Sequence, residues 1–188
     1  MKPFYQGKID SFCAIYAVLN ALRLTHGIRI EKARGIFNDI LMKLATEPFL
    51  LKGVLEQTTD YFFLVDAMLT QCAANMPLCV ERPFSGDDRT SVNDFWQNCE
   101  KWINAGNNRT AIFRFLRYMQ PESPPLVRHW TTIETIGSES LHLYDSSHDA
   151  DAIMNLKKTD FVTNEKAISK DKLFYVQPSS LRLLRLPF

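Results

Sequence analysis

The first 30 residues contain a stretch that is apolar on every side. Residues 13–22 read Cys-Ala-Ile-Tyr-Ala-Val-Leu-Asn-Ala-Leu, and Asn20 is the only clearly polar side chain among them. A helix that is apolar all round lies in the middle of a domain rather than on its surface. The sequence therefore predicts a buried central helix with Cys13 in its first turn.

Polar residues and a glycine mark the expected ends of this helix. Asp10 or Ser11 precedes the apolar stretch and is the expected N-cap. Residues 25–27 follow the stretch, and a glycine such as Gly27 near the C′ position is typical of a helix end.

Helical periodicity continues through the next 80 residues. Apolar residues recur at helical spacing in residues 31–45 and in residues 61–74, whereas residues 50–57 suggest only a helical turn. Ser91 or Asn93 is the expected cap of one more helix, which is rich in aromatic residues.

The second half of the chain has the pattern of strands. Its strongest hairpin signal is two β-rich runs, residues 126–136 and 140–144, separated by Gly-Ser-Glu at 137–139. Helices first and strands second predict an α+β architecture. The other expected strands are residues 78–82, 111–118 and 172–177, with 181–186 as a candidate for one more.

Length and charge limit the classes of protein. The 188 residues suit one domain or two small lobes, and the net charge of +1 gives no electrostatic case for nucleic acid or an anionic membrane. The amino terminus lacks a signal-peptide core, and no run approaches the ~20 apolar residues of a membrane span. The expected location is cytoplasmic, with specialised secretion without a cleaved signal left open.

The cysteines and histidines do not form a metal-binding pattern. The four cysteines are expected to be reduced, and no two of them form a Cys-x-x-Cys pair. The four histidines lack the helical spacing of metal ligands, so we expect neither a metal nor any cofactor. Cys72, Cys79 and Cys99 have apolar or amphipathic surroundings and are expected in the core.

Cys13 differs from the other cysteines because it begins a helix. The helix dipole and the unsatisfied N–H groups there favour thiolate, the form that attacks carbonyl carbons. The alternative is that Cys13 is one more small core residue, because free cysteine is among the most buried residue types. The helix alone does not distinguish these interpretations.

The hairpin offers a base for such a nucleophile and a group to orient the base. His129 lies in its first strand. Asp145 ends the returning strand, so a turn at residues 137–139 would bring the carboxylate beside His129, where it would fix the imidazole tautomer. The alternative is an ordinary strand histidine and a turn-initiating aspartate, which each residue alone favours.

The other three histidines suit this role less well. His26 is about a helix length from Cys13, at ~1.5 Å per residue. His148 lies in an acidic loop, where a solvated surface role is the simpler explanation. The pattern does not fix the side of the hairpin that His142 faces.

Gln6 completes the candidate site from the segment upstream of the helix. An oxyanion needs donors aimed at the position where charge develops. The backbone N–H of Cys13 is one candidate donor, and the side-chain amide of Gln6 is the second. A surface glutamine is the usual alternative, which Gln6 alone favours.

Taken together, these blocks resemble a papain-like cysteine peptidase. Gln6, then Cys13 opening its apolar helix, then His129-Trp-Thr-Thr-Ile, then Leu-Tyr-Asp145-Ser-Ser match that superfamily in order. Within it, the chain is most similar to the compact bacterial branch related to the double-glycine leader peptidase domains of bacteriocin exporters. Residues 25–110 match only as generic helices.

Two positions depart from this pattern. Six residues separate Gln6 from Cys13, where the related families usually have five. Ala14 stands where a glycine commonly follows the cysteine, which alters packing but not the chemistry.

The resemblance implies one papain-like catalytic domain over residues 1–188, with its site in a cleft between two lobes. The helical lobe would cover about residues 1–108, and an antiparallel sheet or half-barrel lobe about residues 109–188. The residues that inherit the triad and oxyanion roles are Cys13, His129, Asp145 and Gln6.

We therefore expect a thiol hydrolase of amide bonds, foremost a cysteine peptidase with a polypeptide substrate. An acyltransferase, a transglutaminase or a deamidase would use the same site, and the sequence does not decide between water and another acceptor. A third alternative is a catalytically silent papain-like fold that binds a partner through the apolar stripe at residues 181–188.

Overall fold

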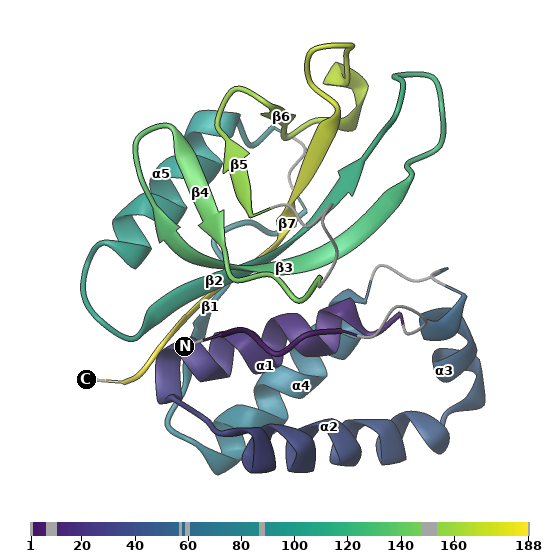
Figure 1. Ribbon diagram of the computed structural model, residues 1–188, viewed down its shortest axis with the longest axis vertical. Helices are drawn as coiled ribbons and strands as arrows, with labels where there is room; N and C mark the ends of the chain where they lie inside the picture. The colour runs from purple at the N-terminus through teal and green to yellow at the C-terminus, as the bar shows by residue number, and fades with distance from the viewer. Residues whose placement is uncertain are drawn as a thin grey trace.

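A computed structural model of the chain describes residues 2–6, 11–56, 58, 61–86, 89–147 and 154–187. Helices and a mostly antiparallel sheet form a mixed architecture (Figure 1), which confirms the predicted α+β class. Among the described residues, no helix is long and apolar enough to cross a membrane. The helices are α1 (Cys13–His26), α2 (Ile30–Ala45), α3 (Pro48–Leu55), α4 (Phe62–Asn75) and α5 (Val92–Ile103).

The strands are β1 (Cys79–Glu81), β2 (Arg109–Arg117), β3 (Val127–Ile136), β4 (Ser140–Leu143), β5 (Asn155–Lys157), β6 (Phe161–Val162) and β7 (Phe174–Arg185). They form one sheet in the order β1-β7-β2-β3-β4-β5, and β6 pairs with β7 in parallel. The predicted hairpin is present as β3 and β4, joined at residues 137–139.

The last strand differs from the prediction. Residues 172–177 and 181–186 were expected as separate strands, but they form the single strand β7, which runs through Pro178. The ladder between β2 and β7 shifts register there, and the Ser180 hydroxyl accepts a hydrogen bond from the Arg114 N–H at 2.8 Å. A bulge of this kind accommodates a proline within a sheet. The short strands β5 and β6 were not predicted.

Helices lie on both faces of the sheet (Figure 1), and the buried side chains form two hydrophobic cores. On one face, α1 contacts β2 and β3 and is itself covered by α2 and α4. On the other face, α5 packs against β2, β3 and β7 through its own aromatic residues. The predicted division near residue 108 groups α5 with the helices, whereas its buried side chains lie in the second core of the sheet.

The helix α1 is the buried central element that its apolar sequence predicts. Ala14, Ile15, Val18 and Leu22 have no exposed surface. The helix ends where expected, because Gly27 adopts a left-handed φ of 63° and its N–H donates to the Arg23 carbonyl. The sheet residues that meet this helical core include Ile112 and Trp130.

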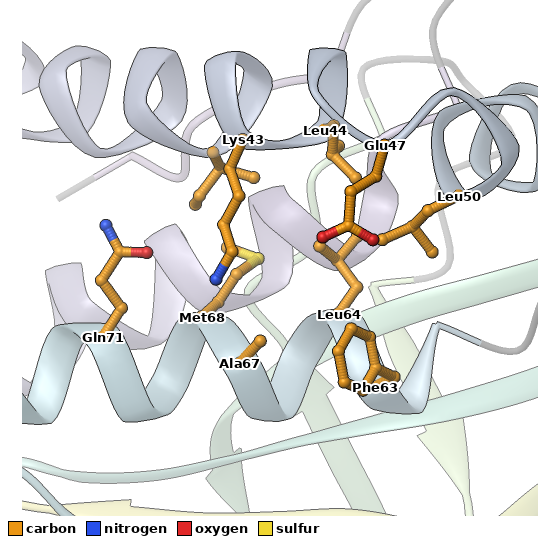
Figure 2. A pocket seen from close by; sticks show the side chains of 10 residues that line it. Lys43, Leu44, Glu47, Leu50, Phe63, Leu64, Ala67, Met68 and Gln71 are labelled. Atoms are coloured by element: carbon orange, nitrogen blue, oxygen red, sulfur yellow. The ribbon is translucent and has the colours of Figure 1, made fainter.

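The helices α2, α3 and α4 enclose a small apolar cavity of about 20 Å³. Figure 2 shows Lys43 of α2 reaching toward Met68 of α4. Phe63 and Leu64 also belong to α4. A polar cavity of this size would hold about one water molecule, and apolar ones stay empty. This cavity is therefore a packing gap of the helical layer.

An ion pair joins the helical layer to the sheet. Arg182 of β7 donates from Nε and Nη2 to the two carboxylate oxygens of Asp66 on α4, at 2.7 and 3.1 Å. Arg82 lies 3.1 Å from the same carboxylate. The Arg182 side chain is only 4% exposed, so Asp66 balances a charge that water barely reaches.

We predict that Asp66→Ala lowers the free energy of unfolding by about 3 kcal/mol, because it leaves the buried Arg182 guanidinium without its carboxylate. Urea unfolding measures this. Glu56→Ala is the control, since it removes an exposed pair with Lys52 at the end of α3 and should change stability by less than about 0.5 kcal/mol. Equal effects of the two substitutions would contradict the role assigned to Asp66.

Candidate active site

Cys13 is the first residue of α1. If Ser11 were the N-cap, the helix would begin one residue earlier, at Phe12. The N-cap is Phe12, whose side chain forms no cap hydrogen bond, so the prediction that Ser11 supplies the cap is wrong. The Ser11 hydroxyl instead donates to the Leu55 carbonyl at 3.4 Å. The other predicted cap, Asp10, lies outside the described residues.

The start of α1 differs from the start of α5 in its N-cap. In α5 a full capping box is present, because Ser91 and Asp94 satisfy each other's backbone N–H groups. At α1 the N-cap is Phe12, whose side chain forms no such bond. The N–H groups and the positive end of the helix dipole can therefore interact with an anion or a developing negative charge.

His129 of β3 and Asp145, which directly follows β4, lie in contact. His129 Nε2 is 2.9 Å from Asp145 Oδ2, and the two side chains are 11% and 3% exposed. The Thr131 hydroxyl donates to the same carboxylate oxygen. The Ser147 N–H donates to Oδ1 at 2.8 Å. Asp145 is thus held by three donors at once.

These contacts keep Asp145 ionised despite its burial. Burial alone would raise the pKa of this carboxyl, because it penalises the charged form. The charge of His129 and the hydrogen bonds from His129, Thr131 and Ser147 act in the opposite direction. Together they lower the pKa of Asp145 to about 2.

The imidazole of His129 connects the carboxylate to the thiol. Burial lowers its pKa, but the Asp145 carboxylate and hydrogen bonds with the Asp145 and Cys13 side chains outweigh burial and raise the pKa to about 10. Because Nε2 faces Asp145, the ring nitrogen left for Cys13 is Nδ1. The edge of the ring also packs on Phe115, 5.5 Å between centroids. The structure therefore brings Cys13, His129 and Asp145 together in that order.

Gln6 lies beside the aspartate segment. Its backbone N–H donates to the Ser146 carbonyl at 2.8 Å, one residue beyond Asp145. The residue is half-buried. This bond brings the segment upstream of α1 to the same end of the molecule as the His129–Asp145 pair.

Asn20 is a structural residue of this site that sequence reasoning did not identify. Its Oδ1 accepts from the Phe4 N–H at 2.7 Å, and its Nδ2 lies 3.2 Å from the Phe4 carbonyl and 3.5 Å from the Tyr144 carbonyl. It therefore holds the segment before Gln6 and the residue before Asp145. The signal was available, because Asn20 is the only clearly polar residue of the apolar stretch 13–22, and it lies two helical turns after Cys13.

Tyr61 supports the residues just before Cys13. Its hydroxyl donates to the Val54 carbonyl at 2.7 Å and the Ser11 carbonyl at 3.3 Å. Its backbone has a left-handed φ of 64°, which is unfavourable for an aromatic residue. Burial, with Cys13 nearby, raises the pKa of this hydroxyl, so it stays a donor. No sequence motif marks this role.

The remaining histidines lie in other contacts. His26 is 2.9 Å from the Pro77 carbonyl, and His142 is 2.9 Å from Asn155 Oδ1. His148 lies outside the described residues. All four cysteines are unbridged. Cys72 and Cys99 are buried as expected, while Cys79 is half-buried.

The described residues contain no group of three His, Cys, Asp or Glu side chains that could hold a metal ion. Comparison with models of known protein families gives no match, and no curated protein matches the chain. Its function must therefore be argued from the site itself.

We predict that Asn20→Leu lowers the free energy of unfolding by about 1–3 kcal/mol, because it leaves the buried N–H and carbonyl of Phe4 unpaired. Hydrogen exchange at the Phe4 and Gln6 amides should also accelerate. Asn75→Leu is the control, since it removes an exposed bond to Gln71 within one helix. Unchanged exchange at Gln6 would show that Asn20 does not hold the segment.

Proposed function

We propose that the chain is a papain-like thiol hydrolase of amide bonds, with a polypeptide as its substrate. The observation that carries the proposal is the position of His129, which contacts the Asp145 carboxylate and the Cys13 side chain. A thiol, a base and a group that orients the base are the parts that nucleophilic catalysis requires.

The charge distribution supports activation of the thiol. The raised pKa of His129 keeps its ring protonated near neutral pH. An imidazolium and a helix N-terminus beside one cysteine both favour the thiolate. Asp145 stabilises the imidazolium and fixes the ring orientation.

In the proposed reaction, the Cys13 sulfur attacks the carbonyl carbon and the carbonyl oxygen becomes an oxyanion. That oxyanion accepts hydrogen bonds from the Cys13 N–H at the start of α1 and from the Gln6 amide. His129 gives its proton to the leaving amine as the C–N bond breaks, which forms a thioester. His129 then takes a proton from water, which attacks the thioester, releases the acid and restores the thiol.

The architecture also supports a papain-like fold. A buried helix with the thiol at its N-terminus packs against the sheet that carries the base and the carboxylate, at a boundary between helical and sheet elements. The same site would serve an acyltransferase, a transglutaminase or a deamidase. The contact between His129 and Cys13 counts against a catalytically silent module.

We predict that iodoacetamide at mildly acidic pH alkylates Cys13 at least about tenfold faster than it alkylates N-acetylcysteine, since His129 and the helix N-terminus would activate the Cys13 sulfur in the proposed mechanism. His129→Gln should remove most of this difference. Intact-protein mass spectrometry measures the rate, and Cys13→Ala gives the background from the other three cysteines. An ordinary rate that His129→Gln does not change would rule out the proposed mechanism.

A further inference from the structure

Thr131 of β3 lies on the same side of its strand as His129. Side chains two positions apart on a strand share a face, and the partners of these two residues on β2 are Phe113 and Phe115. Thr131 is only 1% exposed. Its hydroxyl and His129 Nε2 both contact Asp145 Oδ2, so two residues of β3 share one carboxylate oxygen.

The direction of the Thr131 hydrogen bond follows from the ionised state of Asp145. A carboxylate has no proton to give, whereas a hydroxyl carries one donor. Thr131 therefore donates, and this bond is one of the contacts that lower the pKa of Asp145. It also reduces the negative charge that Oδ2 presents to His129.

Hydrogen bonds on both sides of the carboxylate fix its orientation. The backbone just before Asp145 is held in the sheet, because the Tyr144 N–H donates to the Thr132 carbonyl at 2.8 Å. Rotation of the side chain about its own bonds is then the freedom that remains. The Ser147 N–H binds Oδ1 and the Thr131 hydroxyl binds Oδ2, so this rotation is restricted at both oxygens.

The contact between Asp145 and His129 decides how readily the imidazole releases its proton. The Asp145 carboxylate is the main cause that raises the pKa of His129 to about 10. A general acid works best when its pKa lies near the working pH. A donor that shares the charge of Asp145 therefore brings His129 closer to that range.

Thr131 is placed to act in this way because the other groups around His129 are few. Within the described residues, the titratable groups that face the ring are Asp145 after β4 and Cys13 from α1. The strand β2 presents the ring of Phe115, which carries no charge. Thr131 is the described side chain that binds Asp145 together with His129.

We propose that Thr131 is a positioning residue of the enzyme, which fixes the Asp145 carboxylate and weakens its hold on the proton of His129. In the proposed reaction His129 passes that proton to the leaving amine, and Thr131 eases the transfer without touching the substrate. The inference rests on the proposed function for this catalytic consequence, whereas the effect of Thr131 on His129 is measurable in the protein alone.

The test compares Thr131→Val, which removes the hydroxyl and keeps the branched shape, with Thr131→Ser, which keeps the hydroxyl. Nitrogen-15 NMR of histidine-labelled protein measures the pKa of His129 in each variant. Thr110→Val is the matched control, because the Thr110 hydroxyl is also buried but donates to the Ile133 carbonyl, at 2.6 Å.

We expect the His129 ring in Thr131→Val to hold its proton about three- to tenfold more tightly, so that its pKa rises. The reason is that Asp145 keeps its charge but loses a donor that competes with His129. Thr131→Ser and Thr110→Val should change this proton affinity by less than about twofold.

A purely structural role of Thr131 predicts the opposite sign. If the hydroxyl only kept Asp145 in place, its removal would loosen the contact with His129 and lower the pKa of the ring. A fall or no change in Thr131→Val would therefore overturn the inference, as would an equal rise in Thr110→Val.

A measurement on the unsubstituted protein decides the matter if Thr131→Val does not fold. A hydroxyl proton donated to a buried carboxylate should exchange with water far more slowly than the hydroxyl proton of Thr46, which is exposed and donates to the Lys43 carbonyl. Equal exchange rates of the two hydroxyls would overturn the inference.

Failure of the proposed function is a separate outcome. If iodoacetamide labels Cys13 of the unsubstituted protein at an ordinary rate while Thr131→Val raises the pKa of His129, the proposed function fails and the effect of Thr131 on His129 stands. If Cys13 reacts rapidly but Thr131→Val does not raise that pKa, the role of Thr131 is overturned while the active site stands.

Discussion

The candidate site depends on the hydrogen bonds that hold the buried carboxylate of Asp145. A charge that water barely reaches is stable only when donors surround it, and here His129, Thr131 and Ser147 supply them. The same carboxylate raises the pKa of His129 and, by binding Nε2, leaves the other ring nitrogen for Cys13. The geometry and the charge of the site thus have a common origin.

The fold brings Cys13, which lies near the amino terminus, together with His129 and Asp145 from the second half of the sequence. The apolar surface of α1 fixes Cys13 against the sheet, and Asn20 on the same helix binds the backbone of Phe4 and Tyr144. Tyr61 secures the residues just ahead of the thiol. The N-cap of α1 is Phe12, which is not a capping side chain, and the N–H groups at this helix start can donate to an oxyanion.

The sequence was informative where a pattern repeats along the chain. The uniform apolarity of residues 13–22 predicted α1, and the hairpin signal around residues 137–139 placed His129 near Asp145. Contacts to backbone atoms left no such signal, because any residue offers a carbonyl to Asn20 or Tyr61. The cap at Ser11 was mispredicted, since a one-residue shift in the helix start decides it. The prediction divided β7 into two strands. The bulge that joins them depends on pairing with the neighbouring strand β2, which the sequence does not show.

The proposed mechanism requires His129 to be an imidazolium held between Asp145 and Cys13. A titration of its ring tests this directly. Nitrogen-15 NMR of histidine-labelled protein would follow both ring nitrogens of His129 from acidic to alkaline pH. We expect an imidazolium at neutral pH that loses its proton well above pH 6.5. In Asp145→Asn, the pKa of His129 should fall markedly. A neutral ring at pH 7, or a titration that Asp145→Asn leaves unchanged, would contradict it.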